Sequence, residues 1–184
     1  MSNKTMIENR MLAIIATDGF EQSELLEPKK ELEARGANIH IISINDSESI
    51  RGWNEKDWGE TVTVDKQIEQ ANLDDYDAVV LPGGQMNPDI LRTNSNVVDF
   101  IKAAFNQDKI KAIAAICHAP WLLVEAELVN NKKVTSYPSI RTDMLNAGGI
   151  WEDSEVVTDG KLITSRNPND IPAFIDAICG KLAG

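Results

Sequence analysis

Short apolar runs alternate along this chain with longer segments that have the period of an amphipathic helix. Four runs are rich in β-branched or small apolar residues and are bounded by turn residues: MLAIIA (11–16), NIHIISI (38–44), YDAVVL (76–81) and KAIAAIC (111–117). Such runs are typical of buried strands. The segments 21–36 and 118–128 are predicted helices, and the region 88–107 is predicted to be mostly helical. This alternation predicts an α/β fold, flavodoxin-like or doubly wound, whose mostly parallel sheet lies between helices.

The remaining segments extend the same pattern. EVVTDGKLITS (155–165) predicts two strands joined by an Asp-Gly turn, and NPNDIPAFIDAICGKL (167–182) predicts a closing helix. The stretch from 129 to 149 predicts a turn, a short strand and a helix that ends at a Gly-Gly pair. We find no internal repeat and no low-complexity linker, so we expect residues 1–184 to form a single domain.

Residues 45–65 are harder to interpret. The polar part, up to residue 60, predicts a loop with a short strand pairing, and ETVTVD (60–65) alternates with a period of two. Trp53 and Trp58 either line a pocket or an interface, or pack within a long loop, and loop packing is the interpretation that we favour. His40 lies in an apolar strand, so a structural role is favoured over a catalytic one.

Charge excludes some partners. The chain has 18 basic and 29 acidic residues, a net charge of -11 and a pI of about 4.6. An acidic surface repels phosphate backbones and anionic lipid, so we expect neither nucleic acid nor membrane as a partner. The first thirty residues lack the pattern of a secretory signal, and no apolar stretch approaches the roughly 18 residues of a membrane span. We therefore expect a cytoplasmic protein.

The chain has only two cysteines, Cys117 and Cys179, and two histidines, His40 and His118. The cysteines lie in unrelated contexts, and no CxxC or HxxxH spacing occurs. We therefore expect no structural disulfide, no metal site and no cofactor. A catalytic mechanism that pairs a nucleophile with a histidine must use His40 or His118, and His118 lies next to Cys117 in the sequence.

Cys117 and His118 stand at the junction of a predicted strand and a predicted helix. A nucleophile on such a turn is held in strained geometry, beside the free N–H groups of the new helix. The helix dipole and polar neighbours are expected to lower the pKa of the thiol from about 8.5. The alternative is a buried, inert cysteine. Small residues around the turn, Ala114, Ala115 and Ala119, favour the nucleophile elbow.

Five segments, in this order, carry a resemblance to a known family: TDGFEQSELLEP, LPGG followed by NPDILR, AICHAPWLL, TSYPSIRTDMLNAGG and TSRNPNDIPAF. The chain resembles the PfpI-type intracellular protease and protein deglycase family, part of the class I glutamine amidotransferase-like superfamily. The resemblance extends from Met11 to about Leu182. It implies a stress-related, cysteine-dependent hydrolase that assembles as a homodimer or a larger homo-oligomer.

The resemblance also implies roles for single residues. Cys117 matches the family nucleophile and His118 the adjacent histidine. Asp89 matches an acid that reaches the histidine from a neighbouring subunit, where relatives often have Glu; alternatively, it is only a helix N-terminal residue. Tyr137 matches a pocket tyrosine, unless it only packs there, and Trp121 stands where relatives commonly have a polar residue of the pocket.

The remaining matched residues are carboxyls and glycines. Glu24 matches a carboxyl that hydrogen-bonds the reactive sulfur; the alternative is a surface charge. Glu21, three residues earlier on the same helical face, is either a second pocket carboxyl or a solvated one. Gly83 and Gly84 suit an oxyanion hole built from backbone N–H groups, or form merely a tight turn.

These residues predict attack of Cys117 on an electrophilic carbon. The expected substrates are reactive carbonyls such as glyoxal and methylglyoxal (a glyoxalase activity), or early glycation adducts on proteins and peptides (a deglycase activity). Peptidase activity ranks lower, because no stretch indicates an extended cleft. A glutaminase is disfavoured, because no histidine follows His118. The alternative function is a redox sensor or holding chaperone with an oxidisable Cys117.

Overall fold

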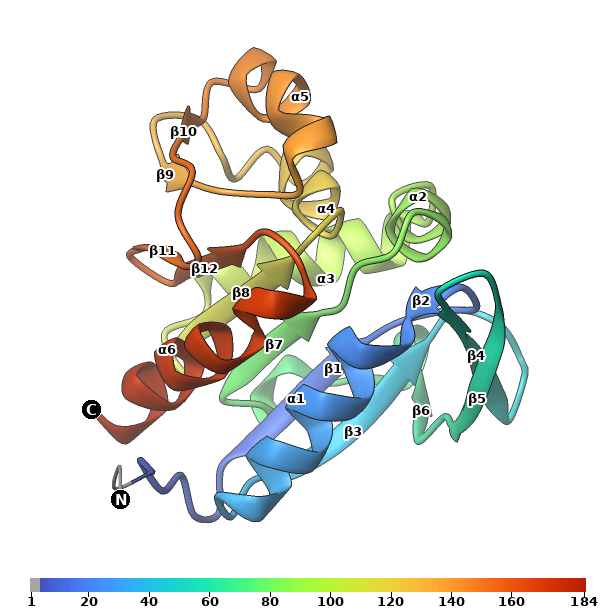
Figure 1. Cartoon of the computed structure of the whole chain (residues 1–184). Coiled ribbons are helices and arrows are strands. Elements are labelled where there is room, and N and C mark those ends of the chain that lie inside the picture. The colour runs from blue at the N-terminus through green and yellow to red at the C-terminus, as the bar shows by residue number, and fades with distance from the viewer. Residues whose placement is uncertain (1–3) are drawn as a thin grey trace.

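The computed structural model describes residues 4–184, and its centre is a seven-stranded sheet (Figure 1). The strand order is β11–β12–β8–β7–β1–β3–β6. Their bounds are β1 Met11–Ile15, β3 Asn38–Ser43, β6 Lys66–Gln67, β7 Ala78–Leu81, β8 Ala112–Ile116, β11 Val157–Asp159 and β12 Leu162–Ser165. All neighbours are parallel except β11 and β12, which form the hairpin predicted at Asp159-Gly160.

Within the described part of the chain, two small sheets and six α-helices complete the fold. Strand β2 (Phe20–Glu21) pairs with β4 (Ser49–Asn54), which pairs with β5 (Asp57–Thr63), while β9 (Lys133–Val134) pairs with β10 (Ile150–Trp151). The helices are α1 Gln22–Ala34, α2 Met86–Leu91, α3 Ser95–Asn106, α4 Pro120–Glu125, α5 Arg141–Asn146 and α6 Ile171–Ala183. Short 3-10 turns occupy 68–70, 73–75, 138–140 and 168–170. None of the helices formed by residues 4–184 has the length and apolar character to cross a membrane.

Alternate residues of each central strand face opposite layers of helices. On β1, Ala13 and Ile15 pack in a core with α3 and α4, whereas Leu12 and Ile14 pack in a second core with α1 and α6. All four are fully buried, and burial of each large apolar side chain contributes about 1.5–3 kcal/mol. A strand covered on both faces has no polar side, which explains the continuous apolar runs. The flavodoxin-like sandwich predicted from the sequence is confirmed.

The structure adds detail to the sequence prediction in two places. The region 88–107 is mostly helical, as predicted, and is divided into two helices because the Asn94 side chain accepts a hydrogen bond from the Val97 N–H (3.2 Å) and begins α3 there. The strand pairing predicted within 45–60 is present and more extensive than expected, because the β4–β5 hairpin takes up most of this segment and pairs with β2 beside the end of β1. His40 has a structural role, with Nδ1 3.0 Å from the Tyr76 hydroxyl.

Candidate functional site

Cys117 follows the carboxyl end of β8 in a left-handed backbone conformation, with φ of 65°. This conformation is unfavourable for a residue with a Cβ and costs about 1–3 kcal/mol. Two backbone hydrogen bonds impose it: the Cys117 N–H donates to the Ser165 carbonyl (3.0 Å), and the Cys117 carbonyl accepts from the Tyr137 N–H (2.8 Å). The predicted strand-to-helix elbow is therefore present, and its side chain is 6% exposed.

His118 lies between the sulfur and a hydroxyl. Its Nδ1 is 3.1 Å from Cys117 Sγ and its Nε2 is 3.1 Å from Ser139 Oγ. The Tyr137 ring stacks on the imidazole at 4.7 Å between centroids, and the Trp121 ring meets its edge at 5.2 Å. Burial lowers the pKa of His118, which favours the neutral ring. With its proton on Nε2, donated to Ser139, this ring can accept the thiol proton at Nδ1.

Glu24, on α1, is fully buried beneath the elbow. Its Oε2 accepts a hydrogen bond from the Gly83 N–H (2.8 Å), and its Oε1 has no partner among the described residues. Burial, and secondly the charge of Glu21, raise the pKa of Glu24 to about 8, although hydrogen bonds to Gly83 and Cys117 act in the opposite direction. Glu24 is therefore not a surface charge. It is mostly a neutral carboxylic acid at pH 7.

The predicted lowering of the Cys117 pKa is not what the structure shows. Burial raises the pKa of this thiol, and a negative charge on Glu24 raises it further, while backbone hydrogen bonds from Gly84 and His118 lower it. The prediction relied on the dipole of the following helix, but α4 is only six residues long and begins at Pro120. The thiol is therefore the resting form, and the thiolate forms when a neighbouring base accepts its proton.

The two glycines have different tasks. The Gly83 N–H donates to Glu24, so it is not available to an oxyanion, and that part of the sequence prediction is wrong. Gly84, with φ of 87°, and His118 are the residues whose backbone N–H groups hydrogen-bond the sulfur. An oxyanion formed at a carbon bonded to this sulfur would lie near these two N–H groups.

Asn87 holds the Gly-Gly turn in place. Its Oδ1 accepts from the Thr17 N–H (2.8 Å), and its Nδ2 donates to the carbonyls of Pro82 (2.9 Å) and Gly83 (3.2 Å). The side chain is fully buried. It therefore joins the ends of β1 and β7 beneath the site. No sequence pattern indicates this role, because an Asn before Pro is also typical of an ordinary turn.

A cavity of about 550 Å³ opens above the elbow. It is lined by Gly19, Glu21, Glu24, Trp53, Glu55, Gly84, Gln85, Met86, Cys117, His118, Tyr137 and Pro168. Glu21 and Tyr137 thus lie at the pocket, as expected, and Trp53 lines it rather than only packing in a loop. A larger cavity of about 720 Å³ lies between α1 and α6, and neither Cys117 nor His118 lines it. We take the smaller cavity as the candidate site because it contains the nucleophile and both of its polar neighbours.

Trp121 does not line this cavity, so its predicted place in the pocket is corrected. Its indole N–H donates to Asp143 (2.8 Å), and the Arg92 guanidinium lies 5.3 Å from the ring centroid. These contacts hold the ring against the edge of His118. Trp121 therefore packs against the His118 imidazole without lining the cavity.

Asp89 is exposed on α2 and makes no hydrogen bond to His118 within residues 4–184. Its role as an acid contributed to another subunit stays a prediction, as does the oligomer that this role requires. Within one chain, Ser139 is the residue that contacts His118 Nε2. The sequence did not single out Ser139, because nothing in the spacing of SYPSI shows which hydroxyl faces the ring.

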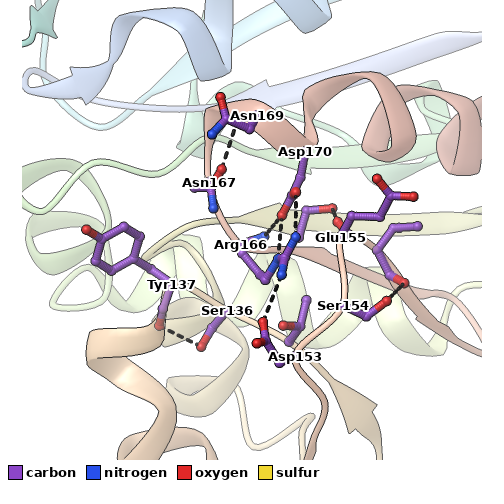
Figure 2. A network of polar contacts seen from close by, with 12 residues as sticks. Ser136, Tyr137, Asp153, Ser154, Glu155, Arg166, Asn167, Asn169 and Asp170 are labelled. Atoms are coloured by element: carbon purple, nitrogen blue, oxygen red, sulfur yellow. Dashed lines mark hydrogen bonds and ion pairs between the residues drawn. The ribbon is translucent and has the colours of Figure 1, made fainter.

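Polar contacts fix the loop that follows β12 (Figure 2). The Arg166 guanidinium makes two hydrogen bonds to Asp170 (2.9 and 3.0 Å) and one to Asp153 (2.8 Å). The Ser165 hydroxyl donates to the Glu155 carbonyl (2.6 Å). Ser165 receives the Cys117 N–H, and Pro168 in this loop lines the cavity. The network therefore stabilises both the elbow and one wall of the pocket.

The pKa of Glu24 predicts a pH-dependent stability. Because folding raises this pKa from 4.5 to about 8, its contribution is fully present below pH 4.5 and is lost as the pH rises through 8. Relative to Glu24→Gln, the unfolding free energy of the wild type should fall by up to about 1.4 kcal/mol per pH unit in this window. Urea denaturation at pH 5, 6, 7 and 8 measures it. In Glu60→Gln, a control at an exposed site, the unfolding free energy should change with pH as it does in the wild type. If the unfolding free energy of Glu24→Gln also changed with pH as in the wild type, the prediction would be wrong.

Comparison with known proteins agrees with this architecture. A family model described as the DJ-1/PfpI family matches residues 9–181. General stress protein 18 of Bacillus subtilis is 42% identical over 166 residues, covering 90% of this chain and 93% of that protein. Protein/nucleic acid deglycase 2 of Escherichia coli is 36% identical over 167 residues, covering 90% and 94%. A crystal structure of a two-domain protein from Anabaena variabilis, with DJ-1/ThiJ/PfpI-like and ferritin-like domains, matches with a TM-score of 0.88 and 35% identity, covering 95% of this chain and 48% of that one.

Proposed function

The chain belongs to the DJ-1/PfpI family, and on this premise we propose that it is a cysteine-dependent hydrolase of small reactive carbonyl compounds. The substrates are glyoxal, methylglyoxal or the early adducts that they form with amines and thiols. A relative named as a deglycase supports the hydrolase class. The observation that carries the proposal is the contact of a strained, buried Cys117 with His118 and Glu24 at the base of one cavity.

The size of the cavity supports a small substrate. A volume of about 550 Å³ lies within the range of small-molecule sites, about 300–1,000 Å³. An extended polypeptide needs a longer groove, so peptidase activity ranks below carbonyl chemistry. A two- or three-carbon carbonyl compound fits beside the sulfur and leaves room for the amine or thiol that carries it.

In the first step, the Cys117 sulfur bonds to the aldehyde carbon of the substrate. The thiol proton passes to His118 Nδ1, which lies 3.1 Å from the sulfur. The carbonyl electron pair moves to oxygen, which the N–H groups of Gly84 and His118 stabilise before it takes up a proton. The product is a hemithioacetal, formed without a resting thiolate.

In the second step, a proton leaves the former aldehyde carbon and another is delivered to the neighbouring carbonyl carbon. The electron pair of the broken C–H bond reduces this second carbonyl to an alcohol, and the first carbon becomes a thioester. No external oxidant is needed. Glu24 suits the proton transfer because its pKa of about 8 allows it to lose and regain a proton near neutrality. Water then hydrolyses the thioester, which releases a 2-hydroxy acid and restores the Cys117 thiol. When the substrate is an adduct, the sulfur displaces the amine or thiol in the first step: the bond from the carbon to that nitrogen or sulfur breaks as the bond to Cys117 forms, and the leaving group takes up the thiol proton.

Partial alkylation tests this proposal. Samples treated with increasing iodoacetamide are analysed for the labelled fraction of Cys117 by peptide mass spectrometry and for formation of the 2-hydroxy acid from methylglyoxal. Activity should fall in proportion to labelling of Cys117, and methylglyoxal should slow that labelling. Cys179 is fully buried and serves as the internal reference.

The alternative, a redox sensor or holding chaperone, predicts a different outcome. It predicts that no carbonyl substrate is turned over, and that peroxide, in place of iodoacetamide, converts Cys117 to a sulfinic acid beside Glu24. Full activity in a sample whose Cys117 is completely alkylated would overturn the hydrolase mechanism. Absence of turnover together with protection of a client protein from aggregation would favour the alternative.

A further inference from the structure

The outer wall of the cavity above Cys117 is acidic. Glu21 in β2 pairs with Trp53 in β4, and Glu55 occupies the turn that follows β4. The Trp53 indole N–H donates to the Glu55 carbonyl (3.1 Å), and the Ser23 hydroxyl donates to Glu21 (3.3 Å). The contact with Ser23 positions the Glu21 carboxyl group, and the contact with Trp53 holds the backbone of the exposed Glu55, so both residues lie on the same wall.

No positive charge balances them at the cavity. The lining includes Glu21, Glu24 and Glu55 but no Lys or Arg, and within residues 4–184 neither Glu21 nor Glu55 forms an ion pair. Lys56 follows Glu55 in the exposed turn but does not line the cavity. Burial is the main cause that raises the pKa of Glu21, and the charge of Glu55 raises it further. A cation placed between these carboxylates would relieve their repulsion.

Aromatic rings complete the wall. Trp53 is half-buried at the cavity, and Tyr137, stacked on His118, also lines it. The Trp53 ring is held by an edge contact with Trp58, at 5.5 Å between centroids. The faces of such rings attract ammonium and guanidinium groups. Carboxylates beside aromatic rings are a combination that suits a cation and disfavours an anion.

We propose that this wall selects cationic substrates, namely carbonyl adducts that carry an ammonium or guanidinium group close to the reacting carbon. The proposal rests on the proposed hydrolase function for the reaction, and on Glu21, Glu55 and Trp53 for the selection. The reacting carbon lies at Cys117 while the positive group of the same molecule contacts the carboxylates. Neutral adducts are accepted with lower affinity, and anionic adducts are disfavoured.

Matched thiol reagents test the selection without any turnover. Three methanethiosulfonates, bearing a trimethylammonioethyl, a methyl or a sulfonatoethyl group on sulfur, each transfer that alkylthio group to Cys117 as a mixed disulfide and release methanesulfinate and the thiol proton. Labelling is followed by mass spectrometry of the Cys117 peptide, and each rate is divided by the rate with free 2-mercaptoethanol. We expect the cationic reagent to react about tenfold faster than the anionic one, and the ratio to fall as salt is added.

Each variant is judged by its ratio of cationic to anionic labelling rate, so a change in the overall reactivity of Cys117 cancels. Glu21→Gln and Glu55→Gln should each lower the ratio of cationic to anionic rate by about threefold to fivefold, and the double variant should bring it near one. Glu60→Gln is the matched control, because it removes one negative charge from the exposed face of the same hairpin. A wild-type ratio near one overturns the proposal. The proposal is also overturned if Glu60→Gln and Glu55→Gln lower the ratio of cationic to anionic rate equally, because the preference would then come from the net charge of the protein and not from the cavity wall.

A second measurement connects the selection to the reaction. The hemithioacetals of methylglyoxal with thiocholine, 2-mercaptoethanol and mercaptoacetate are cationic, neutral and anionic, and kcat/KM should fall in that order. If none is turned over while the reagents still show the charge preference, the hydrolase function has failed and the cation-selective wall stands. If all three are turned over equally and the reagents show no preference, the wall has failed and the hydrolase function stands.

Discussion

Replacement of Cys117 by alanine is expected to lower the turnover of methylglyoxal by about 10³-fold or more, to the rate of the uncatalysed reaction. The covalent bond to the substrate forms at this sulfur, and no second thiol reaches the cavity within residues 4–184, because Cys179, on α6, lies fully buried in the core between α6 and the sheet. Alanine retains the Cβ and therefore the same left-handed backbone at φ of 65°. The free energy of unfolding should change by no more than about 1 kcal/mol.

The measurement is formation of the 2-hydroxy acid under conditions in which the wild type is saturated, with far-UV circular dichroism to verify the fold. Cys179→Ala is the matched control and should retain activity, because its sulfur has no access to the cavity. Activity of Cys117→Ala within tenfold of the wild type would exclude covalent catalysis by this residue.

Replacement of Gly83 by alanine is expected to reduce the free energy of unfolding by about 3 kcal/mol and to abolish turnover. A Cβ at this position would lie 2.6 Å from the Ile116 carbonyl oxygen, 2.6 Å from Glu24 Oε2 and 2.7 Å from Cys117 Cβ. The Ile116 carbonyl belongs to β8 and cannot move without the strand. The added methyl group therefore displaces either the elbow or the carboxyl beneath it. Urea denaturation and the hydroxy acid assay measure the two effects.

Gly160→Ala separates steric overlap from backbone strain. Gly160 has φ of 59° in the β11–β12 turn, and a Cβ there would meet nothing within 4 Å. Its cost should be limited to the strain of a left-handed alanine, about 1 kcal/mol, with turnover retained. Equal stability losses in the two variants would mean that the contacts around Gly83 are not what requires a glycine there.

The sequence was sufficient to predict the buried strands of the central sheet, whereas β6, with only two residues, was not predicted. Strands such as β1, β7 and β8 are buried on both faces, so their side chains are apolar at nearly every position and the pattern is easily recognised. The meeting of Glu24, the Gly-Gly turn and Cys117 was predictable as well. In a parallel sheet, the carboxyl ends of neighbouring strands bring the following loops together.

The parts of the site that sequence reasoning got wrong depend on burial and on single hydrogen bonds. The resting state of Cys117 is decided mainly by burial of the elbow, and the elbow is held in place by backbone hydrogen bonds to Ser165 and Tyr137, which are distant in the sequence. The task of the Gly83 N–H is decided by one contact with Glu24. Trp53 reaches the cavity through pairing with β2, a strand of two residues that is too short to show any periodicity.

The small sheet that carries Trp53 and Glu55 is separate from the seven-stranded sheet that carries Cys117. The exposed turn of the β4–β5 hairpin can therefore be lengthened, shortened or exchanged while Ile50 keeps β4 in the core and Asn87 continues to hold the base of the cavity. A chain built in this way can acquire a new substrate range through its hairpin and keep the same reaction. For protein engineering, this hairpin is the natural segment to randomise.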